Sequence, residues 1–281
     1  GADLRLPAVV EALVPLEPDR GWAWAPGERR WRDGRVYEAD QRSFCRLQQD
    51  HLQQQGLTLQ AGFELEWMVL AADAGPHGSP AFPGGPYGAD RLVEGLDYAS
   101  EICDALDAAG LDWLQFHPEY GASQFELSLA HAAAVEAADR LVLARLVIQR
   151  VSRRLGLRCS FTPKLTSDQV GNGGHVHFSL LRHGQPVLQG GDGPGGVLPE
   201  GAALIAGVLH HLPVLLPIAC PLMASYARLS PSSWSAPYQV WGIENREAAL
   251  RLVPTSVDRV PAHRELKVAD LGADPYLLPG A

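Results

Sequence analysis

Hydrophobic and polar residues alternate along several short runs of the chain, and each run predicts a β-strand. In residues 62–70, aromatic and aliphatic residues alternate with Glu64 and Glu66. Because strand side chains point to the two faces of a sheet in turn, both carboxylates lie on one face and the apolar side chains on the other. Further strands are predicted at residues 123–129, 158–162, 174–181, 249–253 and 264–268.

Longer segments repeat their apolar residues at the spacing of a helix. Residues 40–55 predict a polar helix that ends at Gly56, and residues 89–109 predict a helix that ends at Gly110. Residues 132–155 predict a long amphipathic helix whose basic C-terminal end suits the helix dipole. Strands mixed with long helices, without a strict strand–helix–strand alternation, predict an α+β fold around a mostly antiparallel sheet.

The most apolar segment, residues 202–224, predicts a buried helix followed by an irregular stretch. Two histidines and three prolines interrupt it, so we do not expect it to span a membrane. The Gly- and Pro-rich residues 72–88 and 184–196 predict loops, the second of which suits a hairpin. Residues 20–40 lack periodicity, and the first 18 residues lack the basic start and apolar run of a signal peptide.

Composition narrows the class of protein. The chain has 281 residues, 46% of them hydrophobic, which is enough for one large or two small cores. Its net charge of −9 and its lack of basic blocks argue against a nucleic-acid partner and suit a soluble, cytoplasmic protein. Cys45, Cys103, Cys159 and Cys220 have no Cys-x-x-Cys spacing, so reduced and mostly buried thiols are expected rather than a disulfide framework or a zinc ribbon.

Candidate chemistry starts with residues 171–179, where three glycines precede a predicted strand with two histidines. His175 and His177 are two residues apart, so they project from one face of the strand. The glycines allow the backbone to approach a bound group closely. A His-x-His pair by itself is as often a packing or surface pair as a ligand pair. The interpretation of His175 and His177 as a ligand pair is supported here by charged residues on the other predicted strands.

Carboxylates recur on those strands. Glu126 has apolar neighbours on both sides, and Glu119 precedes it across a Gly-containing turn. Glu265 shares a face with Lys267. A glutamate that faces a core costs free energy unless it is paired or binds a metal. The strand carboxylates and an imidazole suit Mg²⁺ or Mn²⁺ beside phosphate oxygens, whereas the simpler alternative gives each strand one solvated face.

Three arginines lie near turns and strand starts: Arg228, Arg246 and Arg251. A guanidinium binds a phosphate or a carboxylate through two N–H groups, and it also forms ordinary salt bridges. Arginines that face two divalent-cation sites describe a phosphoryl-transfer pocket. The sequence contains no Walker-type phosphate loop.

In this combination the chain resembles the glutamine synthetase family. The resemblance implies a catalytic domain in which a curved, mostly antiparallel sheet forms a half-barrel with flanking helices. It rests on eight motifs in the family's order: Gly-x-Glu-x-Glu at 62–66, Glu-Tyr-Gly-x-x-Gln-Phe-Glu at 119–126, Pro-Lys at 163–164, Gly-x-Gly-Gly-His-x-His at 171–177, Ser-Tyr-x-Arg-Leu at 225–229, Asn-Arg-x-x-x-x-Arg at 245–251, Glu-x-Lys at 265–267 and Ala-Asp-Pro-Tyr-Leu at 273–277.

The resemblance also implies an activity, cofactors and partners. In the family, ATP phosphorylates the γ-carboxylate of glutamate with the help of two or more Mg²⁺ or Mn²⁺ ions. Ammonia or an amine then displaces phosphate from the γ-glutamyl phosphate. The same ATP-dependent ligase activity is implied for this chain, with assembly into a homo-oligomeric ring of the hexamer or dodecamer type.

The family's functional positions are retained in this chain by motif. His177 and Arg251 match residues beside the ATP phosphates, and Lys267 stands where the family prefers an arginine. Three residues match positions that hold glutamate and stabilise the transferring phosphoryl group: Gly171, Arg228 and Arg246. Six residues match the metal ligands: Glu66, Glu119 and Glu126 for the first cation, and Glu64, His175 and Glu265 for the second.

The motifs depart from the family at the flap that closes the site. Ser235 stands where the family has a glutamate that takes a proton from bound ammonium, and Val170 replaces an asparagine before the histidine motif. A serine supplies neither the negative charge nor a base of suitable pKa. We therefore expect a primary amine, an amino alcohol or a polyamine as acceptor. The alternatives are inefficient use of ammonia and a flap glutamate placed elsewhere in the loop.

The chain is short at both ends relative to the family. Residues 1–60 are expected to be the end of the N-terminal β-grasp region and a linker. Residues 61–281 are expected to be the catalytic domain without its C-terminal part, so the chain is either partial or naturally truncated. Two other functions compete with the ligase: a catalytically impaired relative with a structural or regulatory role, and a mononuclear His-x-His metal oxygenase.

Overall fold

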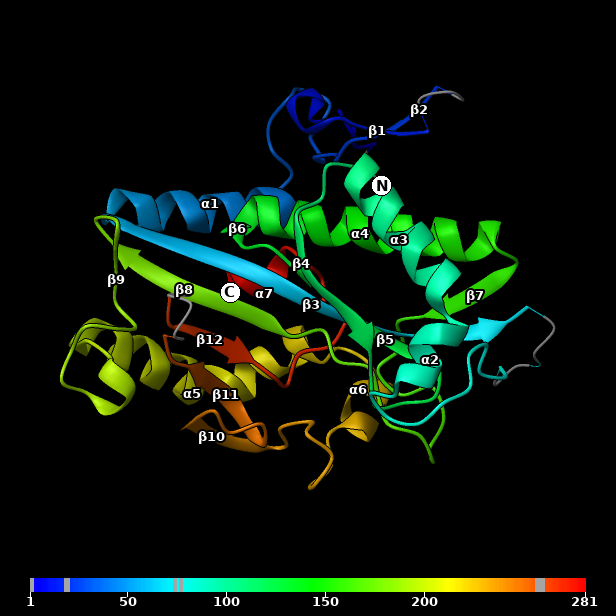
Figure 1. Cartoon of the computed structure of the whole chain (residues 1–281). Coiled ribbons are helices and arrows are strands. Elements are labelled where there is room, and N and C mark those ends of the chain that lie inside the picture. Colours follow the sequence, from blue (N-terminus) through cyan, green and yellow to red (C-terminus); the bar gives the residue numbers. More distant parts are fainter. Residues whose placement is uncertain (1–2, 18–20, 73–74, 76–77, 256–260) are drawn as a thin grey trace.

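The computed structural model describes residues 3–17, 21–72, 75, 78–255 and 261–281. Within them a large, mostly antiparallel sheet forms the centre of the molecule (Figure 1). Its ten strands are β3 (Leu57–Ala71), β4 (Trp113–Pro118), β5 (Gln124–Leu129), β6 (Ala132–Ala133), β7 (Leu157–Ser160), β8 (Val176–Arg182), β9 (Gln185–Pro186), β10 (Tyr238–Ile243), β11 (Ala248–Val253) and β12 (His263–Leu266).

Neighbouring strands follow the order β10-β11-β12-β8-β3-β5-β4, while β6 and β7 pair with β3 and β9 pairs with β8. All of these pairs are antiparallel except β10 with β11. The ends of this path, β10 and β4, do not pair with each other in the described part of the chain, so the sheet is open rather than a closed barrel. The predicted α+β class and the mostly antiparallel sheet are confirmed.

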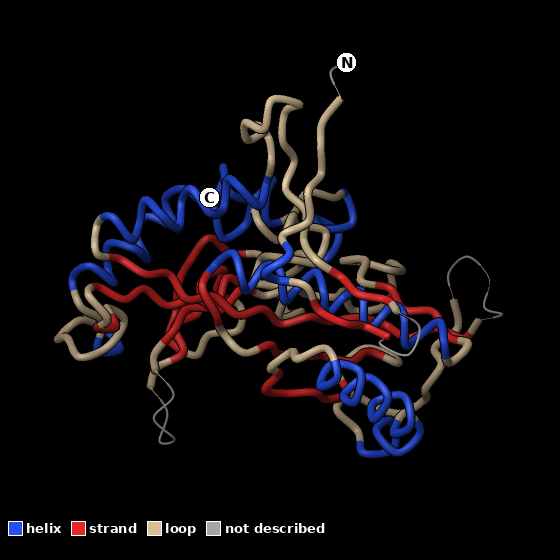
Figure 2. The backbone as a smooth tube through the Cα atoms, turned by 90° about the horizontal axis from the view of Figure 1, so that it is seen from above, coloured by secondary structure: helices blue, strands red, loops and turns tan. Residues whose placement is uncertain are grey.

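Helices lie on the outside of the strands (Figure 2). Two long ones, α1 (Gln41–Gln54) and α4 (Ala134–Arg154), run along β3 (Figure 1). A small hairpin of β1 (Val14–Glu17) and β2 (Trp22–Trp24) lies outside the main sheet. The other helices are α2 (Ala89–Glu94), α3 (Leu96–Ala108), α5 (Pro199–Ala219), α6 (Met223–Arg228) and α7 (Leu277–Gly280).

A local cap and a tertiary contact explain where the first helices begin and end. The Asp40 carboxylate caps α1 by accepting from the Ser43 N–H at 2.8 Å. Residues 89–109 were predicted as one helix, but they form two helices, α2 and α3, which are separated at Gly95. A Cβ at Gly95 would lie 3.0 Å from Phe125 Cζ and 3.2 Å from the Arg91 carbonyl oxygen. The break therefore allows this backbone to pack closely against the sheet.

The apolar face of the sheet forms the core, as the alternation predicts. Phe63, Leu65 and Trp67 are buried under α3 and α4, and each contributes about 1.5–3 kcal/mol through burial. The Trp67 indole N–H donates to the Tyr98 hydroxyl at 2.9 Å, so its one polar group is satisfied inside the core. With this face buried, a one-residue slip of β3 would move its carboxylates into the core.

The prediction of a buried helix within residues 202–224 is wrong in one respect. It forms, as α5, but only 17% of its most apolar window is buried within the described part of the chain. The apolar side chains of α5 itself point to several sides of the helix, but its buried residues lie along one side, which packs against β10 and the core. By length and composition α5 could cross a membrane, but one such helix is weak evidence for a membrane protein.

Two smaller expectations have mixed outcomes. All four cysteines are free, but only Cys45 and Cys220 are buried, whereas Cys103 and Cys159 are half-buried. Strand β4 was not predicted, because its residues do not alternate cleanly and it ends at Pro118. It pairs with β5 and extends the polar face of the sheet next to Glu126.

Candidate active site

Charged residues line up across neighbouring strands in two rows. Residues directly opposite each other in paired strands share a face of the sheet, so each row gathers its side chains. The first row crosses β11, β12 and β8 at Arg251, Glu265 and His177. The second row crosses β4, β5 and β3 at His117, Glu126 and Glu66. All residues of the two rows except His177 line one cavity of about 780 Å³.

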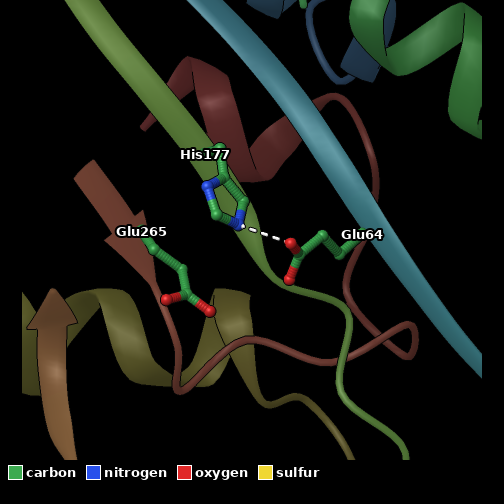
Figure 3. A group of neighbouring side chains, drawn as sticks. All are labelled: Glu64, His177 and Glu265. Atoms are coloured by element: carbon green, nitrogen blue, oxygen red, sulfur yellow. Dashed lines mark ion pairs between the residues drawn. The ribbon is translucent and has the colours of Figure 1, made fainter. Parts of the chain in front are cut away.

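Glu64 joins the first row from β3. Its Oε2 lies 3.0 Å from His175 Nδ1, and its Oε1 lies 3.1 Å from His177 Nε2. Glu265 Oε1 lies 3.3 Å from the same His175 Nδ1. Figure 3 shows Glu64, His177 and Glu265 converging from β3, β8 and β12. We call Glu64, His175, His177 and Glu265 the second-cation group.

The second-cation group fits a divalent cation. An octahedral Mg²⁺ about 2.1 Å from its ligands holds neighbouring ligand atoms about 3 Å apart. The separations of 3.0 Å and 3.3 Å around His175 Nδ1 match that geometry. The three residues predicted to bind the second cation, Glu64, His175 and Glu265, are thus brought together. Glu64, His177 and Glu265 also offer ligand atoms within 4.8 Å of one another.

Side-chain charges compensate the carboxylates of the second-cation group. Burial acts to raise the pKa of Glu64, but the charges and hydrogen bonds of His177 and His175 outweigh it and hold this pKa well below its usual range. Burial likewise opposes the charges of His175 and Lys267 at Glu265, whose pKa is also lowered. Both carboxylates therefore remain ionised at neutral pH.

A first-cation group, which we define as Glu66, His117, Glu119 and Glu126, adjoins the second, because Glu66 Oε1 lies 3.8 Å from His175 Nε2. His117, Glu119 and Glu126 offer ligand atoms within 4.8 Å of one another. His117 Nε2 lies 3.4 Å from Glu126 Oε1. Glu66 lies opposite Glu126 in the sheet, and its Oε2 accepts from the Gly173 N–H at 2.8 Å. The three residues predicted for the first cation therefore also share one face of the sheet and one cavity.

In the first-cation group, the opposite charge of His117 does not outweigh the effect of burial on the pKa values of Glu119 and Glu126. Burial, assisted by the charges of Glu64 and Glu66, raises the pKa of Glu126 to about 7. Burial and the charge of Glu66 also raise the pKa of Glu119. The hydrogen bond to Glu126 raises the pKa of His117 to about 9. Crowded carboxylates that resist ionisation suit a divalent cation, which would stabilise their charged forms.

The three glycines of residues 171–174 are required by protein packing. A Cβ at Gly171 would lie 2.3 Å from the Pro163 carbonyl oxygen. At Gly173 it would lie 2.3 Å from His175 Nε2, and at Gly174 2.6 Å from the Leu271 N. Gly171 also lines the cavity, where the sequence predicted close approach to a ligand. In the structure this close approach is made to protein atoms.

All four basic residues predicted for phosphate or glutamate binding line the cavity: Arg228, Arg246, Arg251 and Lys267. Arg251 Nε lies 2.8 Å from Glu265 Oε2, and Lys267 Nζ donates to Glu265 Oε1 at 3.2 Å. Arg228 donates to the Ala269 carbonyl oxygen at 3.0 Å. Arg246 is exposed. Two of the four cations are thus paired with a carboxylate of the second-cation group.

Ser235 lies in the loop where the family has its flap glutamate. The side chain is buried, and its Oγ donates to the Ser230 carbonyl oxygen and accepts from the Ser230 N–H, both at 2.9 Å. The hydroxyl therefore closes a local turn of the loop. The catalytic role predicted for Ser235 stays a prediction. Its neighbour Trp234 is half-exposed and lines the cavity.

His117 is the residue that sequence reasoning missed. It stands two positions before Glu119, a spacing that would have placed both on one face had β4 been recognised as a strand. The aromatic residues of the cavity, Tyr87, Tyr120 and Trp234, were not singled out either. They lie in loops, where no periodicity marks the direction of a side chain.

Comparison with known proteins gives consistent results. Residues 38–281 match the family model for the glutamine synthetase catalytic domain. The chain is 44% identical over 280 residues to the gamma-glutamylpolyamine synthetase GlnA3 of Streptomyces coelicolor, covering 98% of this chain and 60% of that protein. It is 31% identical over 248 residues to the glutamine synthetase of Pyrococcus horikoshii, covering 88% of this chain and 55% of that protein.

Solved structures are also similar. A novel glutamine synthase homolog superimposes with a TM-score of 0.90 at 33% identity, covering 100% of this chain and 67% of that one. A GmaS/ADP complex superimposes with a TM-score of 0.86 at 27% identity, covering 99% of this chain and 65% of that one. The chain thus spans little more than half the length of the curated relatives that it matches. On the family match and the identity over nearly its whole length, the chain belongs to the glutamine synthetase family.

Proposed function

We propose that this chain provides the catalytic centre of an ATP-dependent ligase that joins the γ-carboxylate of glutamate to an amine. One observation carries the proposal. Six residues that match the family's metal ligands come from separate strands and loops, and all of them line one cavity: Glu64, Glu66, Glu119, Glu126, His175 and Glu265. A surface with merely solvated strand faces would not need these carboxylates to converge.

The residues would divide the work as follows. Glu66, Glu119 and Glu126 would hold one Mg²⁺ or Mn²⁺, and Glu64, His175 and Glu265 would hold another. When bound, the cations would neutralise charge on the γ-phosphate and on glutamate. Three residues would face the ATP phosphates: His177, Arg251 and Lys267. Three others would hold glutamate and the transferring phosphoryl group: Gly171, Arg228 and Arg246.

Two displacements make up the reaction. An oxygen of the glutamate γ-carboxylate attacks the γ-phosphorus of ATP, and ADP leaves. The amine nitrogen then attacks the acyl carbon of γ-glutamyl phosphate, the carbon–oxygen bond to phosphate breaks, and phosphate leaves with the electron pair. The nitrogen loses a proton, and an amide remains. The arginines stabilise the negative charge that the phosphoryl group carries between its two partners.

An amine is a better acceptor here than ammonia. Position 235 carries a serine whose hydroxyl is engaged with Ser230, so it offers no negative charge to an ammonium ion. The relative named as a gamma-glutamylpolyamine synthetase supports the same choice. We also propose a cytoplasmic location and assembly into a homo-oligomeric ring. The division into residues 1–60 and 61–281 stays a prediction.

The test is phosphate release from ATP in the presence of Mg²⁺ and glutamate, scanned over ammonia, ethanolamine, alkylamines and diamines. We expect turnover with at least one amine, and Glu126→Ala should abolish it. The matched control is Glu94→Ala, which removes an exposed glutamate of α2 and should change nothing. Absence of amine-dependent turnover in the full-length protein would overturn the proposal and favour a structural or regulatory role.

A further inference from the structure

Three aromatic side chains stand together on the wall of the cavity: Tyr87, Tyr120 and Trp234. The ring centroids of Tyr87 and Tyr120 are 6.2 Å apart, and those of Tyr120 and Trp234 are 5.3 Å apart. Both pairs meet edge to face, with interplanar angles of 72° and 74°. We call these three residues the aromatic wall. They come from three loops, so only the fold brings them together.

The aromatic wall adjoins the proposed reaction centre on the flap side. The Tyr120 N–H donates to Glu119 Oε2 at 2.7 Å, and the Tyr87 N–H donates to the Glu119 carbonyl oxygen at 3.4 Å. Both tyrosines are therefore anchored to a residue of the first-cation group. Trp234 directly precedes Ser235 in the flap loop, and the backbone N–H of Trp234 donates to Glu247 Oε1 at 2.7 Å.

These rings are exposed rather than part of a core. Tyr87 is 54% exposed, Tyr120 42% and Trp234 48%. Tyr87 and Trp234 also have φ angles of +51° and +52°, in the left-handed region that bulky residues rarely adopt. Such conformations persist where the surroundings impose them, and they concentrate at functional sites. The chain thus holds two large rings at the cavity, at a local conformational cost and without burying them.

The arrangement suits a flexible ligand with a positive charge. The face of an aromatic ring carries negative potential and attracts an ammonium group, most strongly for tryptophan. In an edge-to-face pair at least one face of each ring stays uncovered by its partner, and methylene groups pack well against such a face. Ammonia has neither methylene groups nor a second charge with which to use these rings. A neutral alkyl chain would gain only apolar contact.

We propose that the aromatic wall is an acceptor subsite that selects amines with a second, distal ammonium group, namely diamines and polyamines. This inference rests on the proposed ligase function and names its substrate class. The near amine nitrogen gives one proton to solvent and attacks the acyl carbon. Phosphate then leaves with the electron pair of the carbon–oxygen bond, the nitrogen releases a second proton to solvent, and an amide forms. The distal nitrogen keeps its proton and its charge throughout, and it lies against the rings of Tyr120 and Trp234.

The decisive measurement is a ratio of two acceptors of equal chain length. 1,4-Diaminobutane carries a distal ammonium and n-butylamine does not, so the ratio of their kcat/KM values isolates the charge. We expect the wild type to prefer the diamine by about tenfold or more. Trp234→Leu keeps an apolar side chain but removes the aromatic face, so it should lower this ratio about five- to tenfold. Tyr120→Leu should act in the same direction.

Controls separate this effect from loss of fold. Both amines are assayed on one preparation, so a partly unfolded variant lowers both rates and leaves the ratio unchanged. Trp22→Leu alters another exposed tryptophan, in the β1–β2 hairpin, and should leave the ratio at its wild-type value. If Trp234→Leu reduced the rates with both amines equally, or if the wild type did not prefer the diamine, the aromatic wall would not be a charge-selective subsite.

Failure of the ligase proposal gives a different result. Hydroxylamine is small and traps γ-glutamyl phosphate as a hydroxamate, so hydroxamate formation reports glutamate activation without the aromatic wall. If the wild type formed hydroxamate but showed no diamine preference, only the subsite proposal would fall. If it formed none, calorimetric titration of wild type and Trp234→Leu with each amine would still test the subsite. Equal binding of both amines to the wild type would overturn it.

Discussion

The two cation groups contain similar side chains, but the pKa values of their buried carboxylates are shifted in opposite directions. In the second-cation group, imidazoles and Lys267 lower the pKa values of Glu64 and Glu265 despite burial. In the first-cation group, burial and neighbouring carboxylates raise the pKa of Glu126 to about 7. The second group is therefore compensated by the protein itself. In the first group, Glu119 and Glu126 depend on an added cation for their fully ionised forms.

The largest expected effect is on turnover and is shared by both groups. Glu126→Gln and Glu265→Gln each remove one charged ligand that the proposed reaction needs. Loss of one such electrostatic contact typically costs about 10²–10³ in rate. Steady-state phosphate release with the best amine measures it. If either variant kept more than a tenth of wild-type kcat, that glutamate would not hold a catalytic cation.

The free energy of unfolding, measured without cations, should differ between Glu126→Gln and Glu265→Gln. Glu265→Gln breaks buried contacts with Arg251 and Lys267 and leaves their charges unpaired, which costs about 3–5 kcal/mol of unfolding free energy. Glu126→Gln removes a charge that is poorly tolerated, so at pH 8 the variant should be as stable as the wild type or more stable. Urea unfolding in the presence of a chelator compares them. Equal destabilisation would refute the contrast between the groups.

Cation binding should stabilise the wild type more than Glu126→Gln. Saturation to 100 times the dissociation constant adds about 2.7 kcal/mol for one site, or several degrees in Tm. Glu126→Gln lowers the affinity of the first site, so its Tm should rise less at the same Mg²⁺ concentration. Thermal unfolding across a Mg²⁺ titration measures the difference. Identical curves for both proteins would place Mg²⁺ elsewhere.

The raised pKa of Glu126 also predicts a pH dependence of the stability of the chelated protein. Because the folded pKa of Glu126 is raised from about 4.5 to about 7, folding favours its protonated form. Its contribution to stability is fully present below pH 4.5 and is lost as pH rises through 7. The difference in unfolding midpoint between wild type and Glu126→Gln should therefore shift in favour of the variant over this range. A difference that is flat with pH would contradict the raised pKa.

Strand faces were the most predictable part of this molecule. A period of two in residues 62–67 determines which side chains are buried, and Phe63, Leu65 and Trp67 are indeed in the core while Glu64 and Glu66 line the cavity. The common side of His175 and His177 was predicted from the same alternation, and both imidazoles contact Glu64. These predictions depend on local geometry, which sequence encodes directly.

Features that depend on tertiary neighbours were harder to predict. The break at Gly95 arises because Phe125 lies close to that backbone, and the exposure of α5 depends on which elements cover it. His117 belongs to the site only because β4 pairs with β5. The hydroxyl of Ser235 is engaged by Ser230, five residues earlier in the flap loop. For Gly95, α5 and His117, a segment distant in sequence decides the outcome.

Strand β3 carries one carboxylate of each cation group, Glu64 and Glu66, only two residues apart. The separation between the two groups is thus determined by the repeat of a single strand, about 3.4 Å per residue. Mutation in loops does not change the spacing of these two residues, whereas Tyr87, Tyr120 and Trp234 lie on loops. Under the proposed function, substitution of these rings would therefore change the preferred acceptor and leave the spacing of Glu64 and Glu66 unaltered.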